Sequence, residues 1–343
     1  MRYLMHIIAL LMIVGGVHAQ EDQEESVRLR IVATTTQSAD LVTILTADVP
    51  GIEITGLMGA GVDPHLYQPT ESDITAMNRA DMVVYSGLNL EGQFERVFNA
   101  LNEQGVSTFA TGHPVRDAGF VIGGFDLSEE LSDVDDPHFW FDPRNWELSV
   151  QSLADELIVV DPDYAETYQA NASAYIEQLI LLFEWANDAM RLVDDDQRYL
   201  VTSHDAFQYF GSAFGWRQTA IQGLSTQDEA GVGDIQETVD FIIDNAIPVI
   251  FVESSLPPNT VEAVVEAVRD MGGNVRIGVR ELYSDAMGEP DNFGGTYIGM
   301  IASNVYTILQ SYQCAGVTLT LPDWPDDLTP EPPSDLLDVD CTL

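Results

Sequence analysis

The sequence predicts an α/β protein of two lobes, each a four-stranded, mainly parallel sheet flanked by helices, with one long rigid helix joining the lobes. Strand-like and helix-like segments alternate along two stretches of the chain, which is typical of parallel sheets with helices on both faces. A long amphipathic helix pattern separates the two stretches. The chain has 343 residues, of which 45% are hydrophobic, enough for roughly two domains of ~150 residues each.

The first stretch contains four strand-like segments. Strands are expected at 28–33, 52–57, 81–85 and 106–110, and helices at 36–46, from residue 70 and at 91–102. Glu71 and Asp73 fall in the first turn of the second helix, where negative charge is favourable to the helix dipole. The acidic stretch 117–136 is expected to form a loop, ahead of a helix at 146–159.

The helix predicted between the two stretches is unusually long. It is expected to begin at Asp161-Pro162 and to run to about Val193. Its apolar side chains recur every three or four residues, at Tyr168, Ala172, Tyr175, Leu179, Leu182 and Trp185. A helix of ~32 residues is about 48 Å long, which is more than one small domain needs, so it could run along both lobes and join them stiffly.

The second stretch repeats the alternation. Strands are expected at 198–202, 218–222, 247–252 and 274–279, and helices at 206–214, 235–245, 258–271 and 295–311. From Leu321 the chain is rich in proline and aspartate. We therefore divide the chain into a signal peptide (1–19), an N-terminal lobe (20–160), a linking helix (161–194), a C-terminal lobe (195–312) and a tail (313–343).

The N-terminus has the pattern of a secretory signal. Arg2 precedes an apolar stretch at 4–17, and small residues lead to an expected cleavage site after Ala19. An uncleaved anchor is the alternative. Because no cysteine lies near this junction, lipid attachment there is not expected. The mature chain should be soluble and secreted or periplasmic, since no other segment reaches ~18 uninterrupted apolar residues.

The charge balance is extreme. All 13 basic residues are arginine, and 56 acidic residues bring the formal net charge to −43. A surface of this sign repels nucleic acid and anionic lipid headgroups, so neither is expected as a partner. We interpret the acidity as an adaptation to the medium or an aid to solubility, in preference to a direct role in capturing metal.

Two cysteines, Cys314 and Cys341, lie near the C-terminus. In an oxidising compartment they could pair and fix the tail to the body of the protein. A disulfide is favoured over two free thiols, and neither cysteine has the spacing of a metal site.

Three histidines point to a metal site. His65, His138 and His204 lie at or near the carboxyl ends of predicted strands or in the loops beyond, and Asp285 follows the last strand of the second series. Ligands collect at that edge of open parallel sheets. Three neutral imidazoles and one carboxylate suit a tetrahedral zinc ion, although imidazole also binds iron, nickel and copper, and more oxygen ligands would favour manganese.

Two further residues are candidates for a role at this site. His113 lies after the fourth strand without the Asp-Pro that precedes His65 and His138, so we interpret it as an ordinary polar residue. Glu253 ends a buried strand, where a carboxylate is costly unless it is paired or orients a ligand. We expect Glu253 to support a ligating histidine, with helix capping as the alternative.

At these residues the chain resembles the zinc- and manganese-binding solute-binding proteins of ABC importers, the cluster A-I family. The resemblance extends over about residues 28–312. Its segments, in order, are GVDPHLYQPTESDI (61–74), GLNLE (87–91), DPHFWFDP (136–143), TSHDAFQYFGSAFGW (202–216), IQGLSTQDEAG (221–231), IFVESS (250–255) and LYSDAMGEP (282–290). It implies two lobes around four-stranded sheets, a rigid linking helix, and a metal ion in the cleft held by His65, His138, His204 and Asp285.

The resemblance also bears on the metal and the partner. Members selective for manganese tend to carry glutamate at the third ligand position, so His204 favours zinc. Many dedicated zinc binders have a histidine-rich loop before the second ligand, and the acidic stretch before His138 lacks histidine, which keeps manganese as the runner-up. The implied protein is no enzyme but a monomer that delivers one Zn²⁺ or Mn²⁺ to an ABC permease. The alternatives are a metal-binding adhesin or sequestering protein and, less favoured, a zinc hydrolase.

Overall fold

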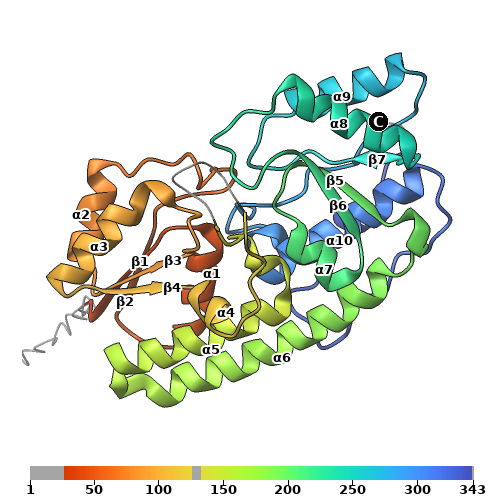
Figure 1. Ribbon diagram of the computed structural model, residues 1–343. Coiled ribbons are helices and arrows are strands. Elements are labelled where there is room, and N and C mark those ends of the chain that lie inside the picture. The colour runs from red at the N-terminus through yellow and green to blue at the C-terminus, as the bar shows by residue number, and fades with distance from the viewer. Residues whose placement is uncertain (1–26, 126–132, 342–343) are drawn as a thin grey trace, which may run out of the picture.

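The computed structural model describes residues 27–125 and 133–341. The predicted signal peptide, residues 1–19, lies outside the described residues. The protein has two lobes lying side by side above one long helix (Figure 1). Within the described ranges, none of the helices combines the length and the apolarity that crossing a membrane requires.

The first lobe is built on one parallel sheet. Its strands are β1 (Leu29–Ala33), β2 (Ile52–Gly56), β3 (Met82–Tyr85) and β4 (Ser107–Ala110), in the order β2-β1-β3-β4. The helices of this lobe are α1 (Thr36–Leu45), α2 (Glu71–Arg79), α3 (Glu95–Gln104) and α4 (His113–Asp117). All four predicted strands are present, and a capping box between Thr70 and Asp73 begins α2 where the sequence indicates.

One long helix, α6 (Ala165–Met190), connects the lobes and runs beneath both of them in Figure 1. The preceding helix α5 (Pro143–Val160) packs beside it under the first lobe. The six apolar residues predicted to line α6 are all buried. The α-helix is shorter than predicted because a separate 3-10 turn forms at Pro162–Tyr164 and the chain leaves the helix after Met190. At 26 residues, α6 is still about 39 Å long.

The second lobe has the predicted α/β alternation, but its strands do not form one continuous sheet. Its strands are β5 (Tyr199–His204), β6 (Arg217–Gln222), β7 (Val249–Ile250) and β8 (Arg276–Ile277), and its helices are α7 (Gln208–Phe214), α8 (Val232–Asp244) and α9 (Asn259–Asp270). Here the expected four-stranded sheet appears as two parallel pairs, β5-β6 and β7-β8. A backbone hydrogen bond from Phe251 to Val201 joins the two pairs. Beyond it, the carboxylate of Glu253 accepts the N–H of His204 at 2.8 Å.

The last long helix, α10 (Tyr297–Cys314), is the most buried helix of the fold, with every residue from Tyr297 to Tyr312 inside. The tail that follows passes over α6, where Nε1 of Trp185 donates to the carbonyl of Asp323 at 3.0 Å. It then returns to α10 through the short helix α11 (Ser334–Leu337).

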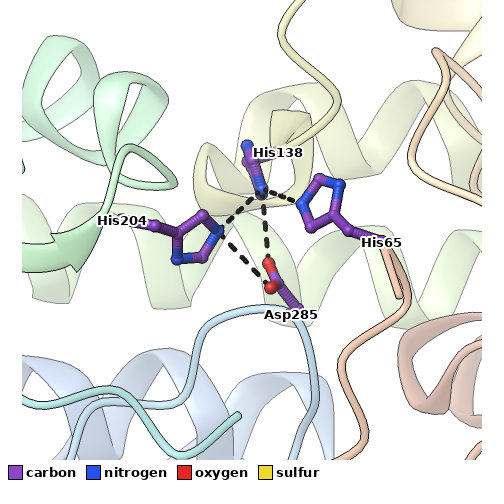
Figure 2. Close-up of side chains that lie close together, drawn as sticks. All are labelled: His65, His138, His204 and Asp285. Atoms are coloured by element: carbon purple, nitrogen blue, oxygen red, sulfur yellow. Dashed lines mark hydrogen bonds and ion pairs between the residues drawn. The ribbon is translucent and has the colours of Figure 1, made fainter. Parts of the chain in front are cut away.

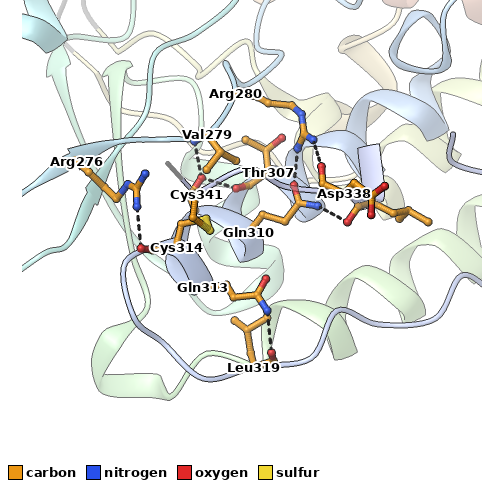
Figure 3. Close-up of a disulfide and its surroundings, with 12 residues drawn as sticks. Arg276, Val279, Arg280, Thr307, Gln310, Gln313, Cys314, Leu319, Asp338 and Cys341 are labelled. Atoms are coloured by element: carbon orange, nitrogen blue, oxygen red, sulfur yellow. Dashed lines mark hydrogen bonds between the residues drawn. A yellow bond between two sulfur atoms is a disulfide. The ribbon is translucent and has the colours of Figure 1, made fainter. Parts of the chain in front are cut away.

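The two cysteines form the favoured disulfide (Figure 3). Cys314 ends α10 and Cys341 ends the described tail, 27 residues later. Beside the disulfide, the Arg280 guanidinium donates to the carbonyls of Asp335 and Asp338 at 2.9 Å each. The tail is therefore fixed to the second lobe at several points.

Candidate metal centre

Four side chains from four distant segments of the chain converge on one point (Figure 2). One potential ligand atom from each of His65, His138, His204 and Asp285 lies within 4.8 Å of the other three. All four residues are at most 2% exposed. The structure thus brings together the four residues that the sequence singled out.

The shortest separations between these atoms match a tetrahedral ion. Nε2 of His138 lies 3.3 Å from Nε2 of His65 and 3.3 Å from Nε2 of His204. The oxygens of Asp285 lie 3.3 Å from Nε2 of His138 and 3.4 Å from Nε2 of His204. A tetrahedron with metal–ligand bonds of ~2.0–2.1 Å has edges of roughly 3.3–3.4 Å. One ion of zinc's size fits between the four groups after small movements.

Two Asp-Pro-His turns present the first two imidazoles. In the first, the Asp63 carboxylate accepts the N–H of His65 at 2.8 Å, and in the second the Asp136 carboxylate accepts the N–H of His138 at 2.9 Å. Aspartate commonly accepts the backbone N–H two residues ahead, which fixes such turns. The repeated motif therefore places a histidine at a defined position after each turn.

Asp136 has a second role that the sequence reasoning missed. Its Oδ1 also lies 2.7 Å from Nδ1 of His138, so that Nε2 faces the cleft. A carboxylate behind a ligating imidazole fixes the ring and its tautomer and strengthens it as a donor. The signal available in the sequence was the Asp-Pro-His motif itself, but Asp63 stands in the same position and makes no such contact with the ring of His65.

His204 lies at the end of β5 and is held by Glu253. The two carboxylate oxygens contact the N–H of His204 at 2.8 Å and its Nδ1 at 2.5 Å. Both residues are fully buried. Glu253 therefore occupies the supporting position that the sequence predicted for it, rather than capping a helix.

Asp285 is fixed from the opposite lobe. Nε2 of Gln37, in α1, donates to the carbonyl of Asp285 at 3.1 Å, and Oγ1 of Thr36 accepts from the N–H of Met287 at 2.9 Å. Gln37 is itself buried, at 3% exposure. The Asp285 segment is thus bonded to the N-terminal lobe, although it follows the strands of the other lobe in sequence.

The electrostatics of the cluster favour a cation. Burial alone would lower the pKa of His138, but the carboxylates of Asp136 and Asp285 outweigh it and raise that pKa to about 9. Burial is likewise outweighed at His204, whose pKa Asp285 and Glu253 hold well above its usual value. Burial would raise the pKa of Asp285, yet His204 and His138 hold it well below its ordinary range. The site is thus surrounded by three carboxylates, those of Asp136, Glu253 and Asp285, which favour a positive charge between them.

His65 differs from the other two imidazoles. Burial lowers its pKa to about 3, against the opposing effect of Asp285. It is therefore neutral at physiological pH, with a ring nitrogen available to a metal.

Both oxygens of Asp285 lack a hydrogen-bond donor in the described structure, although they are buried. Buried carboxylate oxygens are almost always satisfied by donors, by water or by an ion. Because these oxygens point at the imidazole nitrogens, a divalent cation between them would satisfy the whole group. The donors present therefore fit the ion that the sequence suggested.

His113, interpreted as an ordinary residue, lies apart from this cluster. It begins α4, and its ring meets that of Tyr85 edge-on at 6.4 Å.

Comparison with known proteins shows which family the chain belongs to. The profile of the family described as "Zinc-uptake complex component A periplasmic" matches residues 31–311. A manganese-binding lipoprotein, MntA of Bacillus subtilis, is 37% identical over 83% of this chain and 90% of its own length. The zinc-binding protein TroA of Treponema pallidum is 37% identical over 88% of this chain and 96% of its own length.

Solved structures agree with the sequence relatives. The structure of TroA from Treponema pallidum superposes with a TM-score of 0.76 at 36% identity, covering 83% of this chain and 99% of that one. Fe(III)-bound YtgA from Chlamydia trachomatis gives a TM-score of 0.71 at 26% identity, covering 85% and 100%. The chain therefore belongs to the family of periplasmic zinc-uptake complex component A proteins, the metal-binding solute-binding proteins of ABC transporters.

Proposed function

We propose that this protein binds one divalent metal ion, zinc in preference to manganese, through His65, His138, His204 and Asp285, and delivers it to an ABC permease. The convergence of these four buried donors on one point carries the proposal. Three imidazoles and one carboxylate are a donor set typical of zinc. In this proposal the N-terminal lobe (20–160) and the C-terminal lobe (195–312) enclose the ion, and the linking helix (161–194) limits how far they separate.

A transport role is favoured over catalysis. Catalytic zinc sites keep one coordination position open for water or substrate, whereas four protein donors here surround one point. Relatives also carry transport names, such as the metal ABC transporter substrate-binding lipoprotein SsaB of Streptococcus sanguinis, 28% identical over 82% of this chain. We propose an exported, monomeric protein whose partners are the ion and the permease, without nucleic acid.

Manganese is the second candidate, and one observation favours it. Both oxygens of Asp285 are free of hydrogen-bond donors, so the carboxylate could bind through two oxygens and add the oxygen ligand that manganese prefers. One of the relatives at 37% identity is named manganese-binding.

Elemental analysis of the protein purified from its own compartment distinguishes these candidates. The proposal predicts close to one zinc per chain. One manganese per chain would instead support manganese as the ion that is carried. Protein that carries neither metal and binds neither in titration would contradict the proposed function itself.

A further inference from the structure

Among the three converging histidines, His65 is the one whose ring has no carboxylate behind it. Asp136 supports the ring of His138, and Glu253 supports the ring of His204. Within the described part of the chain, the ring of His65 bonds only toward His138, through Nε2. An imidazole without a supporting partner depends on its backbone to keep its position.

The backbone of His65 is held from the other lobe. Oγ1 of Thr226 donates to Oδ2 of Asp63 at 2.6 Å, and Oδ1 of the same carboxylate accepts the N–H of His65 at 2.8 Å. Nε2 of Gln227 donates to the carbonyl of His65 at 3.2 Å. Thr226 and Gln227 belong to the loop that follows β6 of the C-terminal lobe. Both ends of the His65 residue are therefore fixed by a loop across the cleft.

The same loop borders a cavity that reaches the site. This cavity, of about 540 Å³, is lined by Gly223, Ser225 and Gln227 on one side and by Gly92 and Glu95 on the other. Of the four converging residues, His65 is the one that lines it. The histidine whose ring has no carboxylate partner is thus also the one that borders the cavity.

We infer that Thr226 and Gln227 are positioning residues that keep His65 on the metal ion, and that loss of their contacts lets the ion leave through this cavity. The inference rests on the proposed function. Because these two contacts join opposite lobes, any separation of the lobes at the cleft breaks them. His65 then loses the restraint on its backbone, while His138 and His204 keep the carboxylates that belong to their own lobes.

The test is the rate at which a strong chelator removes zinc from the loaded full-length protein in stopped-flow measurements. Thr226→Val keeps the shape of the side chain and removes its hydrogen bond to Asp63. Hydrogen bonds to charged groups are stronger than neutral ones. Loss of this bond should therefore accelerate the release of zinc roughly ten- to a hundredfold. Gln227→Ala removes a neutral bond from an exposed side chain, so acceleration of about fivefold is expected without risk to folding.

Matched variants separate positioning from general damage. Thr226→Ser restores the hydroxyl and should release zinc at the wild-type rate. Thr238→Val makes the same change at a similarly buried threonine of the same lobe, whose hydroxyl bonds the carbonyl of Asp234, and should leave the rate unchanged. The melting temperature of the metal-free protein should be the same for Thr226→Val and Thr238→Val.

Two results would overturn the inference. One is a Thr226→Val/Gln227→Ala double variant that loses zinc at the wild-type rate. The other is Thr226→Val and Thr226→Ser accelerating equally. If instead the wild-type protein fails to bind zinc or manganese at all, the proposed function fails first, so the two failures are distinguishable.

Discussion

Glu253 contacts His204 through both of its carboxylate oxygens. Oε1 accepts the backbone N–H of His204 at 2.8 Å, and Oε2 pairs with Nδ1 of its ring at 2.5 Å. Because Nδ1 is occupied in this way, Nε2 is the nitrogen that faces the cleft. The same residue follows β7, so its carboxylate joins the end of β5 to the neighbouring pair of strands. The candidate metal centre is thus tied to the backbone of the strand that presents His204.

Replacing this carboxylate should weaken metal binding while leaving all four ligands in place. We expect Glu253→Gln to raise the Kd for zinc about 10- to 100-fold, the usual effect of removing the partner behind a ligating histidine. Competition against a chelator of known affinity measures the change. Glu237→Gln, at an exposed position of α8 in the same lobe, is the control and should bind as the wild type does. Equal affinity in the two variants would show that the contact between Glu253 and His204 does not contribute to zinc binding.

Removing a proposed ligand should have a larger effect. His138→Ala takes away the imidazole closest to the other three donors, so zinc affinity should fall by more than the roughly 10- to 100-fold typical of supporting residues. Calorimetric titration measures it, and His113→Ala is the control. Since Asp136 would be left buried without its partner, the variant should be tested also as Asp136→Asn/His138→Ala, which removes the unpaired charge. Wild-type binding in either form would remove His138 from the site.

Metal binding should release protons and tighten as the pH rises. The pKa of His138 is raised to about 9 and that of His204 is raised well above its usual value, so protons compete with the ion for these rings at neutral pH. Ligation requires neutral imidazoles, so zinc displaces protons from the site at pH 7. Titrations in buffers of different ionisation enthalpy count them, and the Kd should decrease steadily from pH 6 to the pKa of His138.

A dependence confined to the range around ~6.5, where free imidazole titrates, would contradict this expectation. It would mean that the carboxylates of Asp136, Glu253 and Asp285 do not hold protons on the rings.

The disulfide should stabilise the fold without influencing the ion. Cys314 and Cys341 close a loop of 27 residues, and a crosslink of this length stabilises a protein by about 3 to 4 kcal/mol in the chain-entropy account. Cys314→Ser/Cys341→Ser should therefore unfold at lower denaturant concentration and bind zinc as before. Chemical denaturation with and without a reductant measures the first effect. If the wild type and the variant unfolded alike under oxidising conditions, the disulfide would contribute nothing to stability.

The sequence predicts much of the fold because local patterns dictate it. The strands of the first lobe follow from the alternation of short strand-like and longer helix-like segments, and α6 follows from apolar side chains spaced by three or four. What the sequence could not predict is the division of the second sheet into two pairs, nor the hydrogen bond between Glu253 and the backbone of His204, because the partners lie 49 residues apart and no local pattern records their contact.

The same distinction holds at the metal centre. His65, His138, His204 and Asp285 could be proposed because parallel strands bring their carboxyl ends to one edge. The different roles of Asp63 and Asp136 could not, since the two turns share one motif and only the three-dimensional orientation of each ring decides whether its nitrogen meets the carboxylate. The contact between Asp63 and Thr226 joins residues 163 positions apart and has no local signal in the sequence.

The most direct test of the central claim is anomalous diffraction from crystals of the zinc-loaded protein. We expect one strong peak per chain, at ~2.0–2.2 Å from a ring nitrogen of His65, His138 and His204 and from an oxygen of Asp285. A peak held by other residues, or density that leaves any one of these four side chains turned away from the ion, would contradict the account.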